Sequence, residues 1–210
     1  MIPADVWNQM LDGNRRFVEN APEHPHQDAG RRNELAASQA PRAALFGCSD
    51  SRLAAEIIFD MGLGDLFVVR NAGQVTGESI MGSLEYAVEV LKVPLIVVLS
   101  HDACGAVRAA IDSFDIDKEP LPPYIWRLIA PIVPAVQSEL RAGSDEGVTH
   151  ETVSAENVGR RHLEQTVASI LRHSELISEA VAEGRLGIVG ANYRLAEGKV
   201  EPRVVVGAEQ

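Results

Sequence analysis

The chain has few of the features that mark several common classes of protein. Cys48 and Cys104 are the only cysteines among its 210 residues, which excludes a disulfide-rich secreted scaffold. Basic residues are also scarce, because 19 Lys and Arg stand against 30 Asp and Glu, for a formal net charge of -11. Proteins that bind nucleic acid or anionic membranes usually have the opposite balance. We therefore expect neither of these partners.

Long apolar segments are missing as well. The longest apolar run, residues 93–99, is much shorter than the about 20 residues that span a bilayer. The first five residues, MIPAD, lack the basic start and apolar stretch of a secretory signal. These absences predict a cytoplasmic protein. In that reducing compartment the two cysteines are expected to be metal ligands or reactive thiols, with a Cys48–Cys104 disulfide as the alternative.

The composition is typical of an ordinary globular protein. Hydrophobic residues make up 46% of the chain and charged residues 23%, and no repeat or linker divides it. We expect a single domain over residues 1–210. Within it, residues 1–38 form a helical arm whose apolar side includes Trp7. The core of the chain and a partner subunit are both candidates to cover that side.

Predicted strands and helices alternate along the chain. Apolar runs that end at turn residues predict strands, and apolar positions at helical spacing predict helices. The predicted strands are 43–47, 66–69, 94–100, 186–190 and an edge strand at 199–206. The predicted helices are 4–20, 31–38, 53–61, 79–91 with Ser79 as its cap, 106–111, 124–141 and 152–183, the last broken near Ser174. This order predicts an α/β fold: a mainly parallel sheet of about four strands plus an edge strand, flanked by helices.

Two loops carry the candidate chemistry. Cys48 follows the first predicted strand, and His101 and Cys104 follow the third. Because the carboxyl ends of parallel strands meet at one edge of a sheet, we expect these three side chains to converge. Two thiolates and an imidazole favour zinc over magnesium or calcium. Three ligands leave a fourth position open, which is typical of catalytic zinc.

Two charged residues stand close to the first cysteine. Asp50 and Arg52 follow Cys48 at alternate positions, so that all three side chains can share one face of an extended stretch. The Asp50 carboxylate can then take the fourth position on zinc or pair with the two-pronged guanidinium of Arg52. The simpler interpretation is a solvated surface ion pair, which contributes little to stability.

Together these motifs resemble a known family. The sequences CSDSR at 48–52 and HDACG at 101–105 are similar to those of the β-class carbonic anhydrases. The resemblance also includes FVVRNAG at 67–73 and SLEYAV at 83–88, and it covers nearly the whole chain. Each motif alone has little specificity, whereas their joint occurrence in this order is highly specific.

The resemblance implies an activity and roles for particular residues. It implies one Zn²⁺ per chain held by Cys48, His101 and Cys104, and reversible hydration of carbon dioxide to bicarbonate by a zinc-bound hydroxide. Asp50 would be a fourth ligand in a closed form and would pair with Arg52 in the active form. A homodimer or homotetramer is also implied. The positions that match the family's substrate cleft are Gln39, Phe67, Ala72, Tyr86 and Gly105.

Three polar residues fall outside these roles. Asp102 follows the predicted zinc histidine, where many relatives have a small or hydroxyl residue, and we expect its carboxylate to face solvent. His24 and His26 are closely spaced in a proline-containing stretch. With no thiol or third ligand beside them, we interpret them as solvated loop residues rather than a metal site.

Three other functions compete with carbon dioxide hydration. The same ligands could serve a hydrolase of carbonyl sulfide or carbon disulfide. A cysteine-nucleophile enzyme is a second alternative, because Cys48 precedes a predicted helix that would lower the pKa of its thiol. The third is a non-enzymatic zinc-binding scaffold in which Asp50 permanently fills the fourth position.

Overall fold

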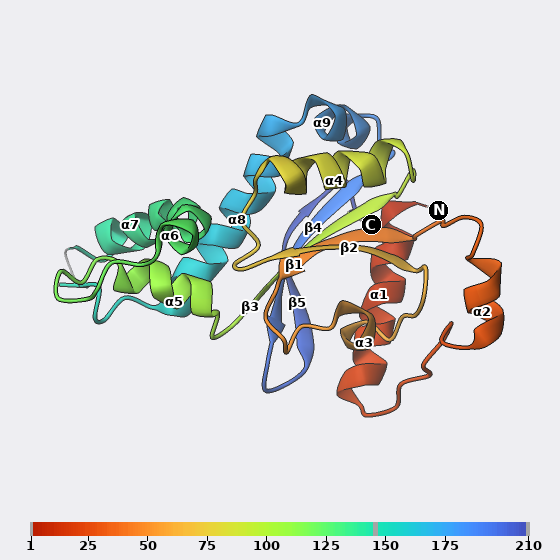
Figure 1. The fold of residues 1–210 in the computed structure, drawn as a ribbon, viewed down its shortest axis with the longest axis horizontal. Coiled ribbons are helices and arrows are strands. Elements are labelled where there is room, and N and C mark those ends of the chain that lie inside the picture. The colour runs from red at the N-terminus through yellow and green to blue at the C-terminus, as the bar shows by residue number, and fades with distance from the viewer. Residues whose placement is uncertain (1, 145–146, 209–210) are drawn as a thin grey trace.

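A five-stranded sheet forms the centre of the computed structural model, which describes residues 2–144 and 147–208 (Figure 1). The strands are β1 (Ala43–Cys48), β2 (Leu66–Asn71), β3 (Leu95–His101), β4 (Gly187–Arg194) and β5 (Lys199–Val206). They lie in the order β2-β1-β3-β4-β5. The first four strands are parallel, and β5 pairs antiparallel with β4 at one edge. This confirms the predicted mainly parallel sheet with an additional edge strand.

The position of each strand follows from its sequence. Every residue of the central strands β1 and β3 is buried, because strands covered on both faces need nearly continuous apolar runs. In the edge strand β5 only Val200 is buried, and the other residues are partly or fully exposed. It also contains Pro202, which lacks a backbone N–H and is tolerated at the edge of a sheet.

Helices cover both faces of the sheet. They are α1 (Pro3–Val18), α2 (Ala29–Glu34), α3 (Ala55–Ile58), α4 (Glu78–Glu89), α5 (Gly105–Asp112), α6 (Pro123–Ile129), α7 (Val133–Ala142), α8 (Ala155–His173) and α9 (Glu175–Ala182), with a 3₁₀ helix η1 (Ala130–Ile132). Figure 1 shows α4 and α9 on one face and α1 and α3 on the other. It also shows α5, α6 and α7 grouped beyond one end of the sheet, with α8 running from this group to α9.

The two faces of the sheet bury separate cores. Successive side chains of β1 point to opposite faces, so Leu45 joins the core that contains Met10 of α1, whereas Phe46 joins the core that contains Leu84 of α4. All four of these side chains are at most 2% exposed. The sheet is therefore held between two apolar layers, and its strand ends are left for polar groups.

The amino-terminal arm contributes to the first of these cores. Trp7 of α1 is 5% exposed and makes an edge contact with Phe59, with 6.4 Å between the ring centroids. The ring that sequence analysis assigned to either the core or a partner is thus buried within its own chain. Contact of the rest of the arm, residues 1–38, with a partner subunit stays a prediction.

Several helix boundaries differ from the expected ones. The expected helix 124–141 is interrupted by η1, where Pro131 and Pro134 cannot continue the hydrogen-bond ladder of an α-helix. The expected helix 53–61 is reduced to the four residues of α3. Gly77 precedes α4, so the predicted Ser79 cap is wrong. The predicted break near Ser174 is confirmed, because the Ser174 hydroxyl accepts a hydrogen bond from the first turn of α9.

Over the described ranges, no helix has the length and apolar character needed to cross a membrane.

Candidate metal centre

Three buried side chains meet where β1 and β3 end. Cys48 is the last residue of β1 and His101 the last residue of the adjacent strand β3. Cys104 follows three positions later, immediately before α5. Their ligand atoms all lie within 4.8 Å of one another. The parallel pairing of β1 with β3 therefore brings together residues that are far apart in the sequence.

The imidazole of His101 is oriented for a ligand. Its side chain is fully buried, and Nδ1 lies 2.7 Å from the backbone carbonyl of Asp102. Because a carbonyl only accepts, Nδ1 carries the proton and Nε2 presents a lone pair. Nε2 has no hydrogen-bond partner within the part of the chain that the structure describes. A buried lone pair without a partner is costly, and a metal ion would satisfy it.

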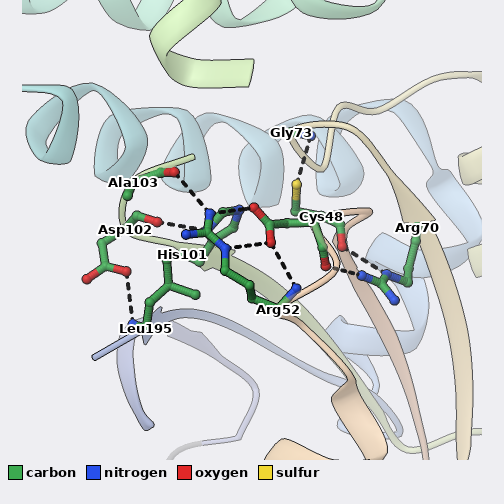
Figure 2. A network of polar contacts seen from close by, with 9 residues as sticks. Cys48, Arg52, Arg70, Gly73, His101, Asp102, Ala103 and Leu195 are labelled. Atoms are coloured by element: carbon green, nitrogen blue, oxygen red, sulfur yellow. Dashed lines mark hydrogen bonds and ion pairs between the residues drawn. The ribbon is translucent and has the colours of Figure 1, made fainter. Parts of the chain in front are cut away.

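The two thiols differ in their readiness to lose a proton. A side-chain hydrogen bond from Cys104 lowers the pKa of Cys48 well below its usual range, against the opposing effect of burial. The backbone N–H of Gly73, 3.3 Å from the Cys48 sulfur, acts in the same direction (Figure 2). The pKa of Cys104 is raised, first by its hydrogen bond to Cys48 and then by burial. The pair is therefore prepared to hold a negative charge, which a cation would stabilise.

The donor set fits zinc in type. Two sulfurs and one imidazole nitrogen are the donors that zinc prefers, and three protein ligands leave one position open. Both cysteines are free rather than joined in a disulfide. The Cys48, His101 and Cys104 group is the single cluster of potential metal ligands among residues 2–144 and 147–208. His26, which was expected to be solvated, has its Nδ1 2.7 Å from Oδ2 of Asp65.

Asp50 and Arg52 lie beside this cluster and form an ion pair. Nε of Arg52 is 2.9 Å from Asp50 Oδ1, and a terminal guanidinium nitrogen is 2.6 Å from Oδ2. This two-point contact is the main cause of a pKa for Asp50 well below its usual range. Oδ2 of Asp50 also lies 3.9 Å from Nε2 of His101. The carboxylate is thus close to the open side of the cluster and is held there by Arg52.

Arg70 is a contributor that sequence analysis did not assign. It is the exposed next-to-last residue of β2 and lies opposite Gly47 of β1. Its Nε is 2.9 Å from the carbonyl oxygen of Cys48 (Figure 2). A terminal nitrogen lies 2.6 Å from the carbonyl oxygen of Asp50. Arg70 therefore anchors the backbone of the loop that carries both residues. The available signal was the position of Arg70 directly after the predicted strand 66–69.

The expectation that Asp102 faces solvent is wrong. Its Oδ1 accepts a hydrogen bond from the backbone N–H of Leu195 at 2.9 Å (Figure 2), and Oδ2 lies 3.7 Å from Nε of Arg194. The carboxylate thus ties the loop after β3 to the end of β4. Because the carbonyl of Asp102 also accepts from His101, this tie supports the residue that orients the imidazole.

The five positions assigned to a substrate cleft come from separate segments of the chain. Phe67 and Tyr86 are in ring contact, with centroids 6.1 Å apart. Ala72 precedes Gly73, and Gly105 is the first residue of α5. Gln39 is exposed in the segment before β1. Their assembly into one cleft stays a prediction.

A separate cavity of about 640 Å³ lies beside α5 and α6, between side chains such as Asp112, Ile116 and Trp126. None of the residues that line this cavity belongs to the predicted site. The cavity therefore does not mark the predicted substrate cleft.

Comparison with known sequences gives one consistent match. A family model described as carbonic anhydrase matches residues 43–200. Carbonic anhydrase 2 of Mycobacterium tuberculosis is 45% identical over 206 residues, which cover 98% of this chain and 95% of that protein. A carbonic anhydrase of Mycolicibacterium smegmatis is 43% identical, with the same coverage of both chains.

Solved structures agree with this match. A chain from a study of two tetrameric β-carbonic anhydrases of Sordaria macrospora has a TM-score of 0.69 at 25% identity, covering 94% of this chain and 96% of that one. The β-carbonic anhydrase of Coccomyxa, in complex with acetazolamide, has a TM-score of 0.72 at 25% identity, covering 94% and 86%. The similarity therefore extends over almost the whole fold.

Proposed function

From the premise that this chain belongs to the β-class carbonic anhydrase family, we propose that it catalyses the reversible hydration of carbon dioxide to bicarbonate and a proton. The observation that carries the proposal is the buried group of Cys48, His101 and Cys104, whose ligand atoms lie within 4.8 Å of one another. The family membership supplies the reaction, and this group supplies a place for the metal that the reaction needs.

Zinc is the metal that these residues would hold, one ion per chain. A zinc ion supplies a water molecule whose pKa falls to about 7, so that hydroxide is available near neutral pH. Cys48 and Cys104 would contribute the negative charge of the site. His101 would contribute Nε2, because its other nitrogen donates to the Asp102 carbonyl. The Asp102 contact holds the imidazole in the tautomer that a metal ligand requires.

Asp50 would orient the reacting oxygen by accepting its hydrogen bond. The carboxylate lies within 3.9 Å of the His101 ligand nitrogen and is pinned by Arg52 from the other side. Because Arg52 lowers the pKa of Asp50, the carboxylate stays an acceptor over the whole physiological pH range. It does not need to be deprotonated before it can act.

The same carboxylate provides a gate. In the arrangement described here Asp50 is bonded to Arg52, which corresponds to the open form of the proposal. Release from Arg52 would let Asp50 take the fourth position on zinc and close the site. Because Arg52 keeps Asp50 ionised in mild acid, protonation of Asp50 would not reduce the activity as the pH falls. The exchange of ligands would add to the loss of hydroxide that a bound water with a pKa of about 7 already implies.

The substrate cleft and the assembly are part of the same proposal. Gln39, Phe67, Ala72, Tyr86 and the backbone of Gly105 would line a narrow cleft for carbon dioxide. Phe67 and Tyr86 already present a joined aromatic surface. The chain would act as a homodimer or homotetramer, by analogy with the tetrameric enzymes of Sordaria macrospora.

Metal analysis and stopped-flow assays test this proposal. Purified protein is expected to hold one zinc per chain and to hydrate carbon dioxide far faster than buffer does. Cys48→Ser and Cys104→Ser should each lose the metal and the activity, because a hydroxyl is a poor substitute for a thiolate on zinc. Lys118→Ala, a change of an exposed residue distant in sequence from the ligands, serves as a matched control.

Other outcomes would select the competing functions. Protein that binds zinc but turns over carbonyl sulfide or carbon disulfide in preference to carbon dioxide would indicate a hydrolase. Activity that survives complete removal of zinc by a chelator would indicate a cysteine nucleophile. Bound zinc that has no exchangeable water, in a protein without any turnover, would indicate a scaffold and would contradict the proposed activity.

A further inference from the structure

Polar atoms without partners gather around one short loop. The buried side-chain nitrogen and oxygen atoms that lack a hydrogen-bond partner, over the ranges that the structure describes, are Gln74 Oε1, His101 Nε2 and His162 Nδ1. His101 is explained by the proposed metal site. Gln74 belongs to residues 71–75, the last residue of β2 and the loop that follows it, and His162 contacts this loop at Gly73. This loop also delivers the Gly73 N–H to the Cys48 sulfur.

His162 of α8 touches this loop from the opposite side. Its side chain is almost completely buried, and Nε2 lies 2.8 Å from the carbonyl oxygen of Gly73. A carbonyl can only accept, so Nε2 must carry the proton. Burial lowers the pKa of His162, which is consistent with a neutral ring whose Nδ1 is a bare acceptor. In this neutral form the one ring N–H, at Nε2, is paired with the Gly73 carbonyl, and no N–H of the ring is buried without a partner.

Gly73 is therefore held between a histidine and a candidate zinc ligand. Its carbonyl accepts from His162, and its N–H donates to Cys48. The residue has a φ of +84°, a conformation that favours glycine. An added Cβ would come within 2.8 Å of the Ala106 side chain and 3.0 Å of that of Ile132. This glycine has little room to move, and its orientation decides where the N–H points.

We propose that His162 is a positioning residue for the metal site, acting through Gly73 to aim a backbone N–H at the Cys48 sulfur. The inference rests on the proposed zinc site. An N–H donor draws electron density from a thiolate and fixes its direction, so groups outside the ligand set tune a metal in this way. His162 touches no ligand itself, and its effect passes through one residue.

The other contacts of the loop do not replace this one. Asn71 bonds to both the N–H and the carbonyl of Val75, which closes the loop on itself. The hydroxyl of Thr166 lies 3.4 Å from the Gln74 carbonyl but only 2.9 Å from the carbonyl of His162 in its own helix. One position beyond the loop, the hydroxyl oxygens of Thr76 and of Ser169 in α8 lie 3.1 Å apart. His162 is the residue of α8 that bonds to Gly73 itself.

A set of substitutions at His162 separates positioning from core packing. His162→Phe keeps a ring of similar size but has no donor for the Gly73 carbonyl. His162→Gln places an amide nitrogen near the position of Nε2 and keeps the donor. Ile170→Val is the matched control. It shortens another fully buried side chain of α8 and so lowers the stability of the fold without touching the contact with Gly73.

Two measurements that do not depend on turnover report the result. Zinc affinity is measured by competition with a chelator, and the thiolate-to-metal charge-transfer band is recorded after cobalt replaces zinc. His162→Phe is expected to weaken zinc binding about 10-fold to 100-fold and to move the band to longer wavelength, because the sulfur loses a hydrogen bond. His162→Gln should recover most of both. Ile170→Val should lower the unfolding temperature and change neither.

The proposal is overturned if His162→Phe lowers the unfolding temperature but matches the wild type in zinc affinity and in the cobalt band. If this variant fails to fold, His162→Asn replaces it, because its amide nitrogen reaches the position of Nδ1 and not that of Nε2. Equal behaviour of His162→Asn and His162→Gln would then overturn the proposal.

The outcomes also separate this inference from the proposed function. If the His162 variants bind zinc as tightly as the wild type, the role of His162 is contradicted and the proposed function is not affected. Zinc binding that responds to His162 in a protein without carbon dioxide turnover removes the proposed reaction alone. A wild-type protein that binds no zinc would remove both.

Discussion

Two of the buried ionisable side chains, Asp60 and His101, differ in how completely they are partnered. Asp60, next to α3, has a side chain that is 1% exposed. It accepts hydrogen bonds from Arg16 and from the backbone N–H groups of Glu23 and His24. At the end of β3, by contrast, the His101 imidazole is fully buried and its Nε2 lacks a partner within the described residues.

The two side chains therefore have different roles. Burying a polar group is costly unless its hydrogen bonds are satisfied, and Asp60 meets that condition with groups of this chain alone. The cluster around His101 does not meet it, because the Nε2 lone pair has no partner among the described residues. This lone pair can bind a metal. The satisfied site stabilises the fold, whereas the unsatisfied one is available for chemistry.

Asp50→Asn should have the largest effect on activity at the unsatisfied site. Loss of the carboxylate is expected to reduce kcat for carbon dioxide hydration by about 100-fold, because an amide orients the reacting oxygen poorly. Zinc content should remain at one per chain. Stopped-flow kinetics and metal analysis on the same samples check both statements, and unchanged turnover would take Asp50 out of the mechanism.

Arg52→Lys is the matched control for that variant. It keeps the positive charge but loses the two-point contact with Asp50. A smaller fall in kcat than in Asp50→Asn is expected, since the carboxylate itself remains. If Arg52→Lys were the more damaging change, the guanidinium would have a role beyond holding Asp50.

Asp102→Ala should have an intermediate effect, because it breaks the tie between the two strand ends. Without the bond to Leu195, the loop that presents its carbonyl to His101 is less constrained. Zinc affinity is expected to fall about 10-fold, as measured by chelator competition. Asp102→Asn can still accept from Leu195 and should stay close to the wild type. Equal affinity of Asp102→Ala and the wild type would show that the tie is dispensable.

Asp60→Asn should have the smallest effect on activity and a clear one on stability. Burial raises the pKa of Asp60, but the hydrogen bonds from Glu23, Arg16 and His24 outweigh it and the net pKa is lowered. A lowered folded-state pKa gives stability that is full above the unfolded value, about 3.9, and is lost as pH falls through the folded value.

Urea unfolding as a function of pH tests this last prediction. At pH 7 the variant should be less stable than the wild type by about 2 kcal/mol, the contribution of hydrogen bonds to a charged group. The gap should narrow as the pH falls below about 4. A gap that does not change with pH would mean that the charge of Asp60 is not what the pocket stabilises. Turnover per folded molecule should be unaffected at neutral pH.

Much of the fold was accessible from the sequence. The apolar runs at 43–47 and 94–100 predicted β1 and β3, because only strands covered on both faces need such runs. Because the two strands were predicted to pair in parallel, their last residues, Cys48 and His101, were expected to lie close together, and they do. The stretch 124–141 was predicted as one helix, but Pro131 and Pro134 lack the backbone N–H that an uninterrupted α-helix needs.

The types of group at the site follow from the sequence alone: two sulfurs, an imidazole, and a carboxylate with a guanidinium two positions away. How these groups are supported depends on the tertiary structure. Asp102 meets Leu195, Arg70 meets the Cys48 carbonyl, and Gly73 lies between Cys48 and His162. These partners are 20 or more positions apart and share no pattern. Strand ends and helices from different parts of the chain bring them together, and hydrogen bonds form only over such short distances.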